Sequence, residues 1–221
     1  MYEVQINDSI PNNLKLIFKK DERLKKIVTI TDEKIIQNIL DEAEYGTLAL
    51  CSNNKPYSLP INFVEVNGEI YFHGAKKGKK MEIIKENTYA SFSVVESYSF
   101  LPSYFSTDKG DACPASQLFK SVIIDGVMKL VENYDEKANA LEFLMQKLQK
   151  EGKYIPLNDK MYQKAINATA LFKLVPSETT GKFKLGQNLN QERYLKVVSN
   201  LKQRGTQKDM DTLTLMQEYS K

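Results

Sequence analysis

The sequence is poor in the residue types that build metal and thiol chemistry. Its 221 residues include one histidine, two cysteines and no tryptophan. The single histidine, His73, excludes a metal site made of several histidines, and the distant Cys51 and Cys113 form neither a disulfide framework nor a zinc site. Each cysteine is better explained as a small packing residue. We therefore expect no bound metal.

The signature motifs of several common enzyme folds are also missing. The sequence has no Walker A motif, no Gly-x-Gly-x-x-Gly motif and no Gly-x-Ser-x-Gly nucleophile elbow. No apolar run approaches the roughly 18 residues that a membrane span needs. The start, Met1-Tyr2-Glu3-Val4-Gln5, does not resemble a secretory signal. We therefore expect a cytoplasmic protein that does not enter a membrane.

The charge is mild and mixed. A net charge of +3, with 27% charged and 42% hydrophobic residues, is ordinary for a soluble globular protein. It is weaker than the basic footprint of a nucleic-acid-binding domain. The C-terminal tail carries Lys202 and Arg204 but also Asp209 and Asp211, so we expect a solvated helix there and no nucleic-acid partner.

The hydrophobic pattern predicts short strands joined by tight turns, with helices between and after them. We expect strands over 46–52, 57–66, 69–73, 89–96, 118–132 and 169–175, with 181–185 as a candidate extension. We expect helices over 31–45, 81–87, 135–150, 159–167, 190–204 and 207–219, with Asp135 capping the third of them. Residues 53–56 are predicted as a turn, and Asn67-Gly68 as a type I′ hairpin turn. Hairpins dominate, so the pattern favours a largely antiparallel barrel, with 118–132 bending at Gly126.

This pattern suggests one domain with appendages. We divide the chain into an N-terminal extension (1–29), a barrel domain (30–189) and a C-terminal helical tail (190–221). The aromatic segment 98–114 is predicted as a long loop that acts either as a lid or as a subunit interface.

The most specific chemical feature follows the predicted strand 69–73. Two glycines bracket a cluster of lysines ahead of a predicted helix, in the order Gly74-Ala75-Lys76-Lys77-Gly78-Lys79-Lys80. Cationic side chains and free N–H groups at a helix start suit a phosphate, and glycines let the backbone approach a ligand. The alternative is a solvated surface turn, and we favour the phosphate.

Three segments together resemble the FMN-binding split barrels related to pyridoxamine 5′-phosphate oxidase. The first two are Tyr45-Gly46-Thr47-Leu48-Ala49-Leu50 and Pro56-Tyr57-Ser58-Leu59-Pro60-Ile61-Asn62-Phe63. The third, Ile70-Tyr71-Phe72-His73-Gly74-Ala75-x-x-Gly78-x-Lys80, is similar to the nitroimidazole-resistance (Nim-type) branch. Residues 181–188 resemble the end of related FMN-binding proteins, some of them labelled as regulators.

The resemblance implies a fold, a cofactor and an assembly. The fold is mainly β, a six-stranded antiparallel split β-barrel with flanking and C-terminal helices. The cofactor is FMN, held at the seam of a homodimer. The flavin ring would lie along the strand residues Tyr57, Ser58, Leu59, Pro60, Ile61 and Asn62.

The same resemblance assigns further residues to the cofactor. Phe72 and His73 would lie near the phosphate and ribityl chain, and Lys79 and Lys80 would grip the phosphate. Ser121 stands where the oxidase has a flavin-contacting glutamine, although a bond to a neighbouring carbonyl explains it equally well. Gln187 would approach the cofactor from the C-terminal segment, or form part of a turn before a helix capped by Asn190.

The sequence departs from the oxidase at two places. Tyr57 replaces the arginine that starts the FMN strand of the oxidase, and the arginine and histidine that bind pyridoxal phosphate near the oxidase C-terminus are not recognisable. We therefore expect an FMN-dependent reductase of small molecules such as nitro compounds or quinones, with NADH or NADPH as electron donor and no catalytic side chain identified. The alternative is a flavin- or haem-binding sensor or regulator without enzymatic activity.

Overall fold

The computed structural model describes residues 29–30 and 32–219. The described residues form two compact units. The barrel unit comprises residues 30–96 and 120–181, and the C-terminal unit comprises Thr29, residues 97–119 and residues 182–219. The expected N-terminal extension lies outside the described residues except for Thr29.

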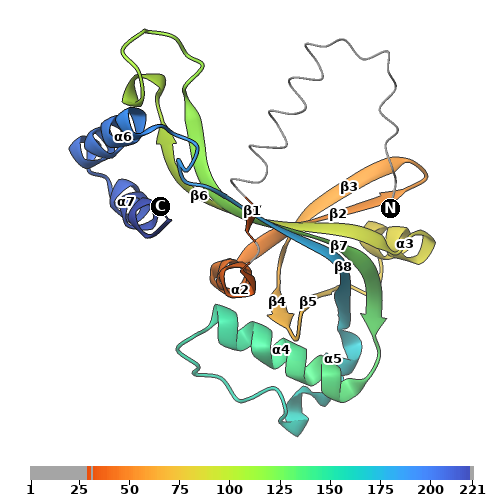
Figure 1. Cartoon of the computed structure of the whole chain (residues 1–221). Coiled ribbons are helices and arrows are strands. Elements are labelled where there is room, and N and C mark those ends of the chain that lie inside the picture. The colour runs from red at the N-terminus through yellow and green to blue at the C-terminus, as the bar shows by residue number, and fades with distance from the viewer. Residues whose placement is uncertain (1–28, 31, 220–221) are drawn as a thin grey trace. The chain divides into compact units, whose positions relative to one another are not determined.

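Eight strands and six α-helices make up the described part of the chain (Figure 1). The strands are β1 (Thr29–Ile30), β2 (Tyr45–Ser52), β3 (Lys55–Asn62), β4 (Val64–Val66), β5 (Glu69–Gly74), β6 (Tyr89–Leu101), β7 (Ser116–Val131) and β8 (Ala170–Lys184). The α-helices are α2 (Glu33–Glu42), α3 (Lys79–Glu86), α4 (Tyr134–Leu148), α5 (Gln163–Ala168), α6 (Gln191–Arg204) and α7 (Gln207–Tyr219). Two short 3-10 helices, η1 (Ser103–Phe105) and η2 (Lys160–Tyr162), complete them.

The strands form one sheet whose two ends are neighbours in the chain. The sheet order is β3-β2-β6-β7-β8-β5-β4, with β1 paired to β8. β3 and β4 stand at opposite ends of this order, yet only Phe63 separates them in sequence. The sheet must therefore curl, and it forms the half-barrel with flanking helices that is expected of a split barrel. The expected strand 57–66 is two strands, because the chain leaves one sheet end and enters the other at Phe63.

Two asparagine-containing turns set the register of the first hairpins. Ser52 pairs with Lys55, which leaves a two-residue loop in which Asn53 and Asn54 both have positive φ angles, of 50° and 59°. The predicted turn 53–56 is therefore too long. Pro56 lies within β3, which tolerates it because β3 is an edge strand. The predicted type I′ turn at Asn67-Gly68 is confirmed by φ angles of 53° and 82°.

Several element ends differ from the sequence prediction. The side chain of Asp32 accepts a hydrogen bond from the Lys34 amide at 2.9 Å and caps α2, which starts at Glu33. Asn133, not Asp135, caps α4, since its Oδ1 accepts from the Glu136 amide at 2.9 Å.

Strands β6 and β8 run further than predicted. β6 continues to Leu101, so the segment 98–101 is strand and not part of a loop. β8 is continuous from Ala170 to Lys184, which joins the strand and the extension that were predicted separately. β7 spans Ser116–Val131 without interruption at Gly126, where a Cβ atom would lie 2.2 Å from the carbonyl oxygen of Val175. The glycine is therefore needed for close approach to β8.

A buried carboxylate organises the C-terminal unit. Asp209, with none of its surface exposed, accepts hydrogen bonds from Arg204 Nε at 2.9 Å and from Thr206 Oγ1 at 2.7 Å. Ser99 Oγ on β6 donates to the same carboxylate at 2.5 Å. The Arg204 guanidinium is the main cause that holds the pKa of Asp209 well below its usual range. The prediction of a simple solvated helix is wrong here, because Arg204 and Asp209 join α6, α7 and β6.

No described helix is both long enough and apolar enough to cross a membrane. The cytoplasmic location stays a prediction.

Asp209→Asn should destabilise the protein, because it leaves Arg204 without its anionic partner. Breaking a buried ion pair by removing one partner costs about 3 to 5 kcal/mol. Since the folded-state pKa of Asp209 is lowered, its contribution is present above the ordinary carboxyl pKa of about 4 and is lost as pH falls below that value. Urea unfolding at neutral and acidic pH would measure the difference.

Asp211→Asn is the matched control, because Asp211 lies exposed on the same helix and, among the described side chains, accepts from Gln207 alone. We expect it to change the free energy of unfolding by less than about 0.5 kcal/mol. Equal urea midpoints for the Asp209 variant and the unaltered protein would contradict the assigned role.

Candidate functional site

The lysine cluster lies where β5 ends and α3 begins. β5 stops at Gly74, and α3 starts at Lys79, so Lys79 and Lys80 belong to the first helical turn and not to the preceding loop. Gly78 occupies the N-cap with a φ of 110° and supplies no side-chain hydrogen bond. The first N–H groups of α3 therefore remain available to an anion.

Lys80 reaches back over the end of β5. Its Nζ lies 5.1 Å from the ring centroid of Phe72 and 4.9 Å from that of Phe172. The two rings stack at 5.3 Å because Phe72 and Phe172 are opposite each other in the β5–β8 register. A Cβ atom on residue 74 would come within 2.3 Å of Lys80 Nζ, so Gly74 provides the space that the ammonium group fills.

The ammonium of Lys80 is half-buried without a compensating charge. No hydrogen bond or ion pair joins it to another residue in the described ranges. Burial lowers its pKa, because removal from water disfavours the charged form. An anion beside it would supply the missing partner.

Lys79 connects the helix start to the edge strand. Its Nζ lies 4.4 Å from the centroid of the Tyr57 ring, a cation–π contact between α3 and β3. The structure thus brings Lys79 and Tyr57 together, and separately Lys80 and Phe72.

The other lysines of the cluster differ from this pair. Lys76 Nζ donates to the carbonyl of Asn167 at 2.6 Å, and the nearby buried Lys137 donates to the carbonyl of Thr169 at 2.9 Å. Both stabilise the C-terminal end of α5, where carbonyl groups lack helical partners. Lys77 is exposed. Lys76 therefore has a structural role.

β3 presents the expected flavin strand at an edge of the sheet. It pairs with β2 on one side and with no described strand on the other. Ser58, Pro60 and Asn62 are exposed, whereas Tyr57, Leu59 and Ile61 are partly buried. The backbone along the unpaired edge is free to bond a ligand or a second chain.

The remaining candidates lie in different surroundings. His73 is exposed on β5, next to the buried Phe72. Ser121 is buried in β7, and no hydrogen bond between described residues joins it to the lysines. Gln187 belongs to the C-terminal unit, where its Oε1 accepts from the Leu185 amide at 2.8 Å and its Nε2 donates to the Phe183 carbonyl at 3.4 Å. Its side chain thus closes a turn of its own segment.

Two supporting features were missed by sequence reasoning. Phe172 completes the aromatic surface beneath Lys80. The hydrophobic pattern of its strand gave no sign of this role. Lys173, next to it, bonds Glu69 and Glu136 at 3.0 Å each and ties β8 to β5 and α4. These two carboxylates raise the pKa of Lys173. The network fixes the strands that carry the aromatic pair.

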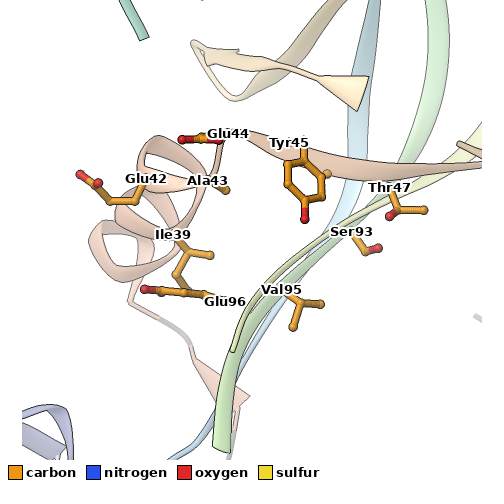
Figure 2. Close-up of a pocket in the computed structure, with 10 residues that line it drawn as sticks. Ile39, Glu42, Ala43, Glu44, Tyr45, Thr47, Ser93, Val95 and Glu96 are labelled. Atoms are coloured by element: carbon orange, nitrogen blue, oxygen red, sulfur yellow. The ribbon is translucent and has the colours of Figure 1, made fainter. Parts of the chain in front are cut away.

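A cavity of about 460 Å³ opens elsewhere in the barrel unit, between the end of α2 and the strands β2 and β6. Figure 2 shows the ring of Tyr45 extending from the start of β2 toward the side of β6 that carries Val95. Glu42, Glu44 and Glu96 also line the cavity, and no lysine or arginine of the described residues does. This charge disfavours a phosphate, so the start of α3 is the better anion site in the barrel unit.

The fold recurs in solved structures of low sequence identity. A proposed 5-nitroimidazole antibiotic resistance protein from Bacteroides thetaiotaomicron VPI-5482 matches with 21% identity and a TM-score of 0.57, covering 70% of this chain and 85% of that chain. The flavocytochrome Anf3 from Azotobacter vinelandii matches with 20% identity and a TM-score of 0.58, covering 71% and 69%. An FAD and haem binding protein from Mycobacterium smegmatis matches with 19% identity and a TM-score of 0.58, covering 71% and 73%.

Comparison with curated proteins gave no match. A family model described as pyridoxamine 5′-phosphate oxidase matches residues 32–183, which is more than half of the chain. This range includes β3, β5 and α3 and agrees with the resemblance that the sequence indicated. The chain therefore belongs to the pyridoxamine 5′-phosphate oxidase family.

Proposed function

We propose that this protein binds FMN and, as a homodimer, reduces small molecules such as nitro compounds or quinones with electrons from NADH or NADPH. The observation that carries the proposal is the half-buried, unpaired ammonium of Lys80 over the end of β5. When bound, the flavin supplies the hydride and electron transfer. The side chains described below bind it and orient it.

The start of α3 fits a phosphate dianion. Lys80 and Lys79 supply two positive charges, and the first turn of α3 supplies N–H groups that Gly78 leaves uncapped. Partial burial strengthens the attraction, because charges interact more strongly away from bulk water. A single phosphate satisfies this arrangement, which is why we propose FMN and not the larger FAD that some structural neighbours are named for.

The edge strand β3 fits the flat ring of the flavin. Tyr57 lies against Lys79, so this strand starts next to the proposed phosphate site. Backbone groups from Tyr57 to Asn62 would bond the ring, and Phe72 would act through the position of Lys80. Direct contacts of His73, Ser121 and Gln187 with the cofactor stay predictions.

An exposed face of the barrel unit supports the homodimer. Tyr45 and Val95 each have 64% of their surface exposed, and Tyr89 has 73%. The register between β2 and β6 places Thr47 opposite Ser93, small residues that allow close packing of another sheet surface. Large apolar side chains around small ones are typical of a surface that associates.

A non-enzymatic haem- or flavin-binding sensor is the second candidate. Two structural neighbours are named as a flavocytochrome and as an FAD and haem binding protein. His73, the single histidine of the sequence, is exposed at the end of β5 and is the natural axial ligand for a haem iron.

The absorbance spectrum of the purified protein separates these functions. We expect flavin absorption that bleaches when NADPH or NADH is added without oxygen and returns when a quinone or nitro compound follows. Mass spectrometry of the released cofactor should identify FMN. A Soret band would favour the sensor, and a protein that stays colourless after incubation with excess FMN would contradict both.

The phosphate site is tested by Lys80→Ala, with Lys77→Ala as the matched control from the same cluster. The Lys80 variant should weaken FMN binding by about 1.5 to 3 kcal/mol, the range for a lost hydrogen bond to a charged group. The control should bind as the unaltered protein does. Fluorescence titration of FMN measures both dissociation constants.

Gly74→Ala tests the position of the charge without removing it. The new methyl group meets only the flexible end of Lys80 at close range, so we expect weaker FMN binding with little loss of stability. If neither the Lys80 nor the Gly74 variant changes the dissociation constant, the phosphate lies elsewhere.

Light scattering of the purified protein tests the assembly. A homodimer should have twice the 25.3 kDa mass of one chain. Tyr89→Glu should shift the mass toward one chain, because a charge replaces an apolar contact. A monomeric mass for the unaltered protein would refute the proposed dimer.

A further inference from the structure

A second cluster of positive charge lines a cavity in the C-terminal unit. The cavity has a volume of about 300 Å³ and is lined by residues of the segments 101–118 and 184–193. Lys184 comes from the last position of β8, and Arg193 comes from the first turn of α6. None of the described residues that line the cavity is an aspartate or a glutamate. Two cationic residues therefore line it, with no acidic residue among the described lining.

These two cations differ from two others of the C-terminal unit. Lys196 forms an ion pair with Asp108, and Arg204 forms one with Asp209. By contrast, no hydrogen bond or ion pair reaches the side-chain nitrogens of Lys184 or Arg193 from any residue that the structure describes. The described residues therefore leave the charge that lines the cavity uncompensated.

The walls of the cavity are held in place by α6. Lys196 binds Asp108, and Asn200 Nδ2 donates to the carbonyl of Phe105 at 3.4 Å, so the helix that carries Arg193 also holds the segment that follows η1. The Arg204 guanidinium lies 4.8 Å from the ring centroid of Phe105. A preformed cavity costs a ligand less ordering entropy than a loose one.

The rest of the lining is suited to an amphiphilic molecule. Leu101 and Leu118 are buried, and each contributes apolar surface to the cavity. Ser116 contributes a hydroxyl group that can donate to an oxygen atom, whereas the Ser106 hydroxyl donates to the Ser103 carbonyl and can only accept. Ligand sites typically combine an apolar wall with a few polar groups in this way, and 300 Å³ is enough for a small molecule.

We propose that this cavity binds a small organic anion, a carboxylate or a phosphate monoester, with its charged group between Lys184 and Arg193. The apolar body of the ligand packs against the leucine side chains. The inference does not depend on the proposed flavin site, because Lys79 and Lys80 belong to the barrel unit. Asn188, which follows Gln187, lines the cavity, so the experiment must separate an added anion from FMN.

The cysteine of the cavity provides a built-in measurement. Cys113 is exposed and lines the cavity. Cys51 shares the outward face of β2 with Tyr45 and Thr47, which the proposed dimer would cover, so free N-acetylcysteine serves as the reference thiol. Iodoacetate and iodoacetamide alkylate a thiol by the same displacement, in which the sulfur forms a bond to carbon, iodide leaves and the thiol proton passes to solvent. Only the charge of the reagent differs, so the ratio of the two rates reports the local attraction for a carboxylate.

With FMN-saturated protein at low ionic strength, we expect the iodoacetate-to-iodoacetamide rate ratio to be about 3- to 10-fold higher at Cys113 than at N-acetylcysteine, and to fall as salt is added. Lys184→Gln and Arg193→Gln should each lower the ratio at Cys113. Lys182→Gln, two residues earlier on β8 and outside the cavity lining, should lower it less than either. Equal ratios at Cys113 and the reference thiol, or an equal effect of the Lys182 variant, would overturn the proposal.

Protection of Cys113 then tests binding directly. Phenyl phosphate or benzoate at millimolar concentration should slow the alkylation of Cys113 by iodoacetamide at least about 3-fold. This is the decrease in rate expected when the ligand concentration is about twice the dissociation constant. Benzyl alcohol should not slow it, and the alkylation of N-acetylcysteine should be unaffected. Protection by one anion and not the other identifies the preferred headgroup. Failure of both, or protection by FMN alone in flavin-free protein, would show that no separate anion site exists.

Discussion

The curl of the sheet depends on one covalent constraint, the single residue between β3 and β4. β3 and β4 stand at the two opposite ends of the hydrogen-bonded order, and Phe63 alone connects them in the chain. Its ring is fully buried, packs edge-on against Phe92 at 4.8 Å and lies 3.7 Å from Lys147 Nζ. A flat sheet could not bring its two edges within one residue of each other, so curvature follows from connectivity as well as from strand twist.

The same strand order creates the candidate anion site at α3. Pairing of β5 with β8 places Phe72 opposite Phe172, and the stacked rings form the surface over which Lys80 lies. Burial alone does not make a lysine a ligand site. Lys147 is also half-buried, and burial lowers its pKa to about 8, but its ammonium donates to the carbonyl of Leu40 at 2.7 Å. Lys80 differs because Gly74 gives it space without giving it an acceptor.

Features set by a few neighbouring residues could be predicted from the sequence, and features set by distant ones could not. The Asn67-Gly68 turn, the Asn190 cap and the stop at Gly205 depend on local backbone geometry, and all three are present. The helical tail was also found, but the burial of Asp209 depends on Ser99, 110 residues earlier. The family was likewise predictable, and the phosphate role of Lys79 and Lys80 stays a prediction, whereas the place of Phe172 required the register of β8.

The side chains beside the proposed flavin favour an uncharged acceptor. Ser58, Pro60 and Asn62 project from the exposed positions of β3, and none carries a charge. Tyr57 stands where the oxidase has an arginine, and it faces Lys79, which the phosphate would already engage. A doubly charged substrate would therefore compete with the cofactor for the same ammonium groups. A flat neutral molecule would meet polar but uncharged groups along the strand, which suits the proposed quinone or nitroaromatic acceptor, because the electron transfer itself would belong to the flavin.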